Sequence, residues 1–418
     1  MKCQNDLAAR TRFVLIGVRL LGTPCWTLLG LLAFILYKQA GLTALQITWI
    51  IALKPMSSLL SPYWSQAIYR RPDRIFANLL GANCLRYVPF LFVPWIDSSW
   101  FVIFSFGFYM TLTRATIPAW MEICKRNLPK LQREQFVALT AMVDYLGTAL
   151  CAVGLGHLLD RYDSAWRWLV SITAVFGMFS TLFLLLIRPS FTAECLLEKS
   201  FEDFTFFRYL REKIAHPWKE VWQLMRRRKD FAVFQMGFMF CGAGLMIMQP
   251  ALPRFFVDTL HLSFVEMGCA ISLCKGIGVA LTTSFWTRLF RSVNIFQLSA
   301  LVTFFACLFP FLLLAASSHG AFVYLAYVFY GIMQGGSEMS WHMSSLVFAE
   351  EKDSSMFSIT NVLAQGLRGS VIPVLGAGLL PWIDALGVMF IGAFICLAAS
   401  CIFWFMPKKA EESVYRRD

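Results

Sequence analysis

Uncharged apolar runs long enough to cross a membrane recur along the whole chain, and they limit the fold more than any other feature. A helix of roughly 20 apolar residues spans the ~30 Å hydrocarbon core of a bilayer. The composition agrees, because 58% of the residues are hydrophobic, only 15% are charged, and the mean hydropathy is +0.61. Water-soluble domains carry about 25% charged residues. The sequence therefore predicts a polytopic helical membrane protein and excludes a soluble enzyme, a secreted disulfide scaffold and a disordered chain.

The apolar runs between charge clusters predict twelve spanning helices. Their ranges are 12–37, 44–69, 75–96, 100–124, 134–159, 165–187, 230–256, 263–287, 293–316, 320–347, 356–380 and 385–406. The longest hydrophilic stretch, 188–229, divides them into six plus six. We interpret this stretch as an amphipathic linker on the cytoplasmic membrane face, with a loosely ordered tether as the alternative. The predicted domains are a six-helix bundle over 1–187, the linker over 188–229, and a second bundle with a short cytoplasmic tail over 230–418.

The basic residues are distributed very unevenly between the two predicted sides of the membrane. The chain has 37 Lys and Arg against 25 Asp and Glu, a net charge of +12. Of the 37, 27 fall on the side of both termini and the linker, and only Lys38, Arg161, Arg167 and Arg254 fall on the other. By the positive-inside rule the termini are cytoplasmic, and we expect a plasma (inner) membrane protein. The basic excess thus indicates topology and not nucleic-acid binding.

The two halves of the sequence match at a constant separation of 221 residues. Lys54 corresponds to Lys275 at this separation, and Trp120 to Trp341. The triplet Pro-Phe-Leu occurs at 89–91 and again at 310–312. Two six-helix halves with the same orientation form a parallel repeat, an arrangement found in secondary transporters.

Four segments of the sequence resemble the major facilitator superfamily of transporters. Residues 153–159 followed by Trp-Arg-Trp at 166–168 resemble its helix 5 and the segment after it, and Thr-Arg-Ala at 113–115 resembles its helix 4 signature. The loop 65–74 is similar to its Gly-x-x-x-Asp-Arg-x-Gly-Arg-Arg loop, although Tyr69 stands where that loop has Asp. The resemblance implies an all-α membrane protein, with twelve transmembrane helices as two parallel six-helix repeats that rock around a midplane site.

Ionisable residues within the predicted spans carry the chemistry, since each costs several kcal/mol if it faces lipid. Counting ~1.5 Å per residue from the helix ends places five of them near the midplane. They are Lys54, Arg86, Asp144, Lys275 and Arg368. Four cations and one acid cannot all be neutralised by pairing, so solvent or an anionic ligand is implied. The alternative is that each cation extends toward the interface or bonds a backbone carbonyl.

These positions define two sets of candidate site residues. The predicted substrate-binding residues are Arg19, Lys54, Lys275, Arg368, Tyr109 and Tyr330. Asp144 is interpreted either as a proton carrier or as a permanent ion pair, with Lys275 as the expected partner. Glu338 and His342 lie four residues apart, so they share a helix face and could form a proton relay or a hydrogen-bonded core pair. Arg114 in helix 4 joins this second, proton-coupling or ion-pairing set.

The sequence therefore predicts a secondary active transporter, and we favour import of a small organic anion, with protons as the possible coupling ion in a symporter. A proton-driven exporter of amphipathic compounds and a transporter-like sensor that binds without flux are the alternatives. Motifs of metal-dependent, ATP-driven or nucleophilic catalysis do not occur in the sequence. We accordingly expect no enzymatic activity, no cofactor and no metal site, and we expect the lipid bilayer and a small-molecule substrate as partners.

Overall fold

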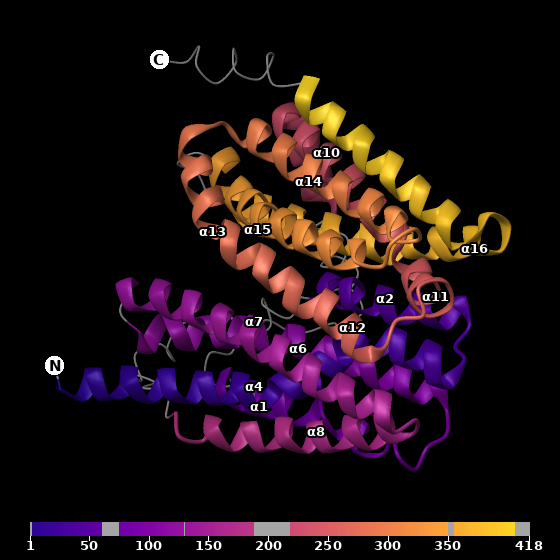
Figure 1. Cartoon of the computed structure of the whole chain (residues 1–418). Helices are drawn as coiled ribbons and strands as arrows, with labels where there is room; N and C mark the ends of the chain where they lie inside the picture. Colours follow the sequence, from indigo (N-terminus) through magenta and orange to yellow (C-terminus); the bar gives the residue numbers. More distant parts are fainter. Residues whose placement is uncertain (1, 61–74, 129, 188–217, 350–354, 406–418) are drawn as a thin grey trace, which may run out of the picture. The chain divides into compact units, whose positions relative to one another are not determined.

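The fold is described from a computed structural model of the chain, which covers residues 2–60, 75–128, 130–187, 218–349 and 355–405 (Figure 1). Within these ranges the regular structure is entirely helical. The chain divides into two compact units, Met1–Glu198 with Pro253–Gly276, and Lys199–Leu252 with Ile277–Asp418. The predicted loop 65–74 and residues 188–217 of the predicted linker lie outside the described residues.

The first unit is a bundle around the long helix α1. Its elements are α1 (Lys2–Ala40), α2 (Ala44–Leu59), α4 (Ile75–Leu85), α5 (Val88–Leu91), α6 (Ser99–Asn127), α7 (Lys130–Arg161), α8 (Ala165–Leu184), η4 (Phe255–Thr259), α12 (Phe264–Gly268) and η5 (Cys269–Cys274). Helix α1 packs against α7 and α8, and α8 lies beside it in Figure 1. Helix α2 packs against α6, and α7 packs against α12 and η5. A core cluster joins α1, α4, α6 and α8 through side chains such as Val14, Leu79 and Leu184.

The second unit is organised around the C-terminal element α16 (Ser355–Phe405). Its other elements are α10 (Lys229–Ile247), η3 (Gln249–Ala251), α13 (Lys275–Ser292), α14 (Ile295–Ala315) and α15 (Phe322–Ala349), and α11 (Leu252–Arg254) follows η3. The boundaries between the units fall inside α11 and α13, so Lys275 and Gly276 belong to the first unit. Asp384 has non-helical dihedrals (φ 58°) and divides α16 into two arms that meet at a sharp bend in Figure 1. This break falls between the two spans predicted over 356–380 and 385–406. Both α10 and α14 pack against α16.

The internal repeat is visible in how α2 and α12 begin. Each helix starts with a complete capping box, formed by Thr43 with Gln46 at α2 and by Ser263 with Glu266 at α12. In such a box the cap side chain accepts from the third backbone N–H, and the third side chain accepts in return. The residues two positions before the caps, Gly41 and His261, both have positive φ, 61° and 52°. The same helix-to-helix connection therefore occurs twice in the first unit.

These two connections are 220 residues apart, whereas Lys54 and Lys275 are 221 apart. The extra residue lies between Ser263 and Lys275, and this stretch contains the π-helix η5. A π-helix bonds residue i to i+5, so each turn holds about one residue more than an α-helical turn. We attribute η5 to this one-residue insertion, which the wider turn absorbs. Lys275 consequently keeps a position on its helix equivalent to that of Lys54 on α2.

Seven helical segments of the described residues are long and apolar enough to cross a membrane. They are Leu7–Ala40, Ser99–Ile117, Ala165–Leu184, Lys229–Thr259, Phe264–Ser292, Ile295–Ala315 and Met356–Phe405. The last of these contains both arms of α16. The all-helical membrane class is thereby confirmed, while the total of twelve spans stays a prediction. At the end of the predicted linker, residues 218–227 form a helix whose Leu224 and Met225 pack against the core of the second unit.

Candidate functional site

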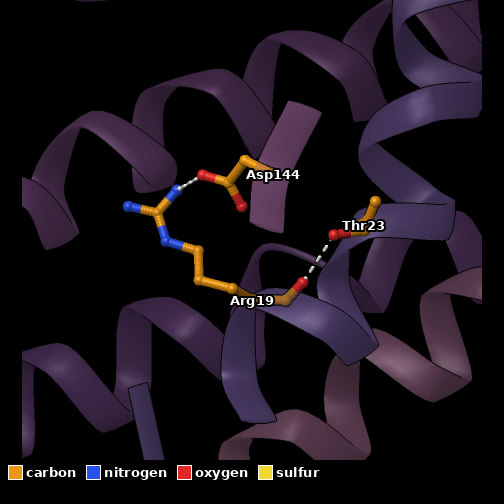
Figure 2. A network of polar contacts seen from close by, with 3 residues as sticks. All are labelled: Arg19, Thr23 and Asp144. Atoms are coloured by element: carbon orange, nitrogen blue, oxygen red, sulfur yellow. Dashed lines mark hydrogen bonds and ion pairs between the residues drawn. The ribbon is translucent and has the colours of Figure 1, made fainter. Parts of the chain in front are cut away.

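Two groups predicted from the sequence, Arg19 and Asp144, form an ion pair between α1 and α7. Nη1 of Arg19 lies 2.8 Å from Oδ2 of Asp144, and Figure 2 shows the guanidinium pointing at the carboxylate. One turn further along α1, the Thr23 hydroxyl donates to the Arg19 carbonyl at 2.8 Å (Figure 2). A Cβ at Gly147 would lie 3.2 Å from Cγ2 of Thr23, so the two helices cross closely at this point. The close crossing brings the two charged groups within bonding distance.

This pair corrects the prediction that Asp144 pairs with Lys275. The prediction assumed that the neighbour of α7 at the depth of Asp144 is the helix that carries Lys275. In the structure α7 contacts α1, α12 and η5, and a Cβ at Gly276, next to Lys275, would lie 3.9 Å from the ring of Tyr145, next to Asp144. The helix of Lys275 therefore passes near this level of α7, but the Asp144 carboxylate is bonded to Arg19 of α1. Both side chains of the pair keep accessible surface, with 57% of Arg19 and 36% of Asp144 exposed. The single midplane acid is thus bonded to a cation that the sequence had placed in the substrate set.

Lys54 is the centre of a group of cations in the first unit. Its Nζ lies 5.1 Å from the ring centroid of Trp26 on α1, a cation–π distance. Lys275 and Arg114 are close enough to Lys54 for their like charges to act on it. Among the described residues no carboxylate forms an ion pair with Lys54 or Arg114. We call Lys54, Lys275 and Arg114 the cationic cluster.

Arg86 and Tyr109 form a separate group on the inner side of the first unit. Nη2 of Arg86 donates to the Tyr87 hydroxyl at 2.8 Å, and its Cζ lies 4.7 and 5.3 Å from the rings of Tyr87 and Tyr109. Arg86 is buried, and so are both tyrosines. The chain leaves helical geometry between α4 and α5 at this point, where Pro89 follows. Tyr109, predicted to bind substrate, is therefore packed with Arg86 and Tyr87.

In the second unit, Arg368 lies across α10. Its Nη1 donates to the carbonyl of Phe238 at 2.6 Å, and the guanidinium packs on Gly242, where a Cβ would collide with it. Its buried Nε has no hydrogen-bond partner among the described residues. The bond to a helix carbonyl is the alternative that the sequence left open for each midplane cation. Tyr330 packs against the rings of Phe309 and Tyr327, with centroids 4.7 and 6.1 Å away.

The structure describes only part of the predicted proton-coupling or ion-pairing set. Glu338 accepts a hydrogen bond from Nε2 of Gln334 at 3.2 Å. The side chain of His342 lies outside the described residues, so the proposed Glu338–His342 pair stays a prediction. A neutral polar network that the sequence did not reveal lies nearby, since Gln235 donates to Asn361, and Asn361 donates to the Trp341 carbonyl at 3.1 Å. Single buried amides within apolar runs give no periodic signal, which is why they were missed.

The family follows from a comparison with known protein families. A model described as "Major Facilitator Superfamily" matches residues 14–372, most of the chain. The chain belongs to the Major Facilitator Superfamily. The resemblance drawn from segments 65–74, 113–115, 153–159 and 166–168 is confirmed, and the chain is a multi-pass membrane protein of a solute transporter family. No curated protein matches the sequence.

Solved structures of superfamily transporters share the fold at low sequence identity. A POT family transporter in complex with 5-aminolevulinic acid is 13% identical over 95% of both chains, with a TM-score of 0.72. The nucleoside transporter NupG is 12% identical over 96% of this chain and 99% of its own, also with a TM-score of 0.72. The peptide transporter POT in complex with sulfate is 13% identical over 98% of both chains, with a TM-score of 0.69. At these identities the likeness establishes the fold of the superfamily member and not its substrate.

Proposed function

We propose that this superfamily transporter moves a small organic anion, bound at the cationic cluster. The observation that carries the proposal is the grouping of Lys54, Lys275 and Arg114 in the first unit while the one midplane acid is bonded to Arg19. Like charges held close together repel one another, which raises the free energy of the site when it is empty. A bound anion lowers it by supplying the opposite charge. Cations of this kind within a membrane span are expected to line a substrate pathway.

The Arg19–Asp144 pair supplies a route to proton coupling. A carboxylate that is bonded to a guanidinium when ionised loses that bond when it takes up a proton. Arg19 would then be released, and its charge would add to the positive potential available to an anion. Proton symport with an organic anion is the coupling that this arrangement favours. The accessible surface of both side chains supports the exchange of a proton with water.

The solved relatives guide the choice of first ligands. One POT structure holds 5-aminolevulinic acid, another holds sulfate, and NupG is a nucleoside transporter. A screen of this protein should therefore include carboxylic acids, inorganic sulfate and uncharged nucleosides. Ligands that bind the native state raise its apparent stability, by about 2.7 kcal/mol at a concentration of 100 times Kd. We expect organic acids to raise the melting temperature of the purified protein and nucleosides to leave it unchanged.

Lys54→Gln tests the assignment of the site, with Lys219→Gln as its control. Lys219 is an exposed lysine of the helix 218–227, so the control removes the same charge away from the spans. We expect Lys54→Gln to weaken the stabilisation by the best organic acid at least tenfold in apparent Kd, and Lys219→Gln to leave it unchanged. Equal responses of both variants, or stabilisation by nucleosides or cations alone, would contradict an anionic substrate. Uptake of the same acid into sealed proteoliposomes distinguishes transport from binding without flux.

A further inference from the structure

The start of α12 is held by a carboxylate from another helix. Oδ1 of Asp160 on α7 accepts from the backbone N–H of Phe264 at 2.8 Å, and Oδ2 accepts from that of Val265 at 2.9 Å. The third N–H, of Glu266, is satisfied by the Ser263 side chain within the capping box. The first backbone N–H groups of a helix lack partners inside the helix, and a negative charge there is favoured by the helix dipole. Asp160 thus makes two charge-assisted bonds to α12.

Glycines allow the backbones of α7 and α12 to touch beneath these bonds. A Cβ at Gly156 would lie 3.0 Å from the backbone of Phe264, and one at Gly268 would lie 2.9 Å from the carbonyl oxygen of Ala152. Ala152 and Gly156 on α7, four residues apart, therefore form a small-residue face, with Ala152 against Gly268 and Gly156 against the backbone of Phe264. Small residues of this kind permit close helix approach inside membranes. The contact is close, and it is polar at one end.

The neighbouring contacts at this end of the unit are also polar. The Tyr37 hydroxyl donates to Oδ2 of Asp258 at 2.6 Å, and Nζ of Lys38 donates to the Leu262 carbonyl at 3.2 Å. Lys38 also lies 4.7 Å from the ring centroid of Phe264. Water can replace each of these hydrogen bonds when the groups separate, at a small net cost.

The segment that Asp160 holds is flanked by two helical irregularities. The π-helix η4 ends at Thr259 before α12, and the π-helix η5 begins at Cys269 after it. Single π-turns inside helices occur frequently at functional sites, and irregular turns mark hinges. From Phe264 the helix continues without interruption to Ser292. Lys275 lies eleven residues below Phe264, about 16 Å along this helix.

We infer that Asp160 is a positioning residue of the transport cycle, whose carboxylate holds α12 against α7 in the closed state and releases it when this end of the protein opens. The bonds between Asp160 and the N–H groups of Phe264 and Val265 form the clasp. Because α12 leads directly to Lys275, opening the clasp also moves Lys275 relative to Lys54. Only this last link rests on the proposed anion site.

Hydrogen–deuterium exchange of the full chain in lipid nanodiscs, without any ligand, measures the clasp directly. In the wild-type protein we expect the amides of Phe264 and Val265 to exchange by local opening, faster than the amides of the buried positions Val170 and Ala174 on α8. Asp160→Asn should accelerate exchange at 264–265 about tenfold, the equivalent of ~1.4 kcal/mol. Asp160→Glu, which keeps the charge, should restore most of the protection.

Two matched controls separate the clasp from general destabilisation. Asp163→Asn removes the same charge three residues later, from an exposed side chain, and should leave exchange at 264–265 unchanged. Gly156→Ala should accelerate it by pushing α12 away, whereas Gly154→Ala, whose Cβ would meet nothing within 4 Å, should not. Equal exchange in wild type and Asp160→Asn would overturn the inference. So would wild-type amides at 264–265 that exchange no faster than those of α8, because the contact would then be static. Neither result depends on the anion screen.

Discussion

Arg19, from the predicted substrate-binding set, and Asp144, from the predicted proton-coupling or ion-pairing set, form an ion pair in the structure. Both side chains keep accessible surface around their 2.8 Å contact, so its strength lies between two limits. Exposed ion pairs contribute about 0.2–1 kcal/mol, whereas removing one member of a buried pair costs about 3–5 kcal/mol. The accessible surface of both side chains argues for the lower part of this range.

We predict a coupling of about 1 kcal/mol between Arg19 and Asp144 in a double-mutant cycle. Arg19→Gln and Asp144→Asn should each lower the melting temperature in detergent, because each leaves one charge without its partner. The double variant should lose less stability than the two single losses added together. Additive losses would mean that the pair contributes nothing, and the proton-coupling proposal would lose its basis. Lys275→Gln combined with Asp144→Asn should show a smaller coupling, which distinguishes the observed partner from the one expected from sequence.

At the level of single residues, the predicted partner of Asp144 was wrong, because Arg19 and not Lys275 is bonded to it. Depth along a helix follows from counting residues, so the sequence placed Lys54, Asp144 and Lys275 at similar levels. Pairing depends on which neighbouring helix passes closest, and that is decided by small residues such as Gly147 at the crossing. The long side chain of Arg19 on α1 then reaches the Asp144 carboxylate on α7. The sequence shows where these glycines are, but it does not show which neighbouring helix each of them contacts.

At the scale of helices, the repeat was predictable and its one-residue irregularity was not. An ungapped comparison finds the separation of 221 at Lys54 and Lys275, and it misses the capping boxes, which are 220 apart. The signature of a capping box, Ser or Thr followed three residues later by Gln or Glu, is present at 43–46 and at 263–266. Only the structure shows that η5 absorbs the difference. An inserted residue inside a helix is not visible in the hydrophobic pattern when the helix segments before and after it still present the same faces.

If η5 accommodates an inserted residue, deleting one residue there should be tolerated. Removing Leu273, an exposed residue of η5, would convert the π-turn to an α-turn and leave the flanking helix faces aligned. We expect a loss below about 2 kcal/mol. Removing Phe304, an exposed residue of the regular helix α14, should rotate the following turns by about 100° and cost far more. Thermal unfolding of both variants in the same detergent makes the comparison, and equal losses would refute the insertion account of η5.

At the scale of the whole molecule, composition and run length were sufficient for the membrane class and, with four short segments, for the superfamily. The midplane charge imbalance points to a class of ligand, but the shape that selects one substrate arises from side chains of many helices. Arg368 illustrates the limit, because its bond to the Phe238 carbonyl is a property of packing on α10. Similar folds at 12–13% identity bind quite different solutes, as a POT transporter with 5-aminolevulinic acid and NupG illustrate. The substrate is therefore determined by the packing of individual side chains, which the hydrophobic pattern of the sequence does not show.

The orientation of the molecule in the membrane follows from charge alone and is open to a direct test. The predicted loops and tails on one side hold 27 Lys and Arg and those on the other hold four. Basic loops stay in the cytoplasm, so the linker 188–229 should face inward, and the loops around Ser98 and Ser318 should face outward. A membrane-impermeant maleimide added to intact cells should label a cysteine at Ser98 or Ser318, and not one at Ser200. Permeabilised cells provide the control, because there all three positions should react. The same orientation places the clasp at Asp160 on the outer side, so labelling at Ser200 alone would reverse both the topology and the side on which the clasp opens.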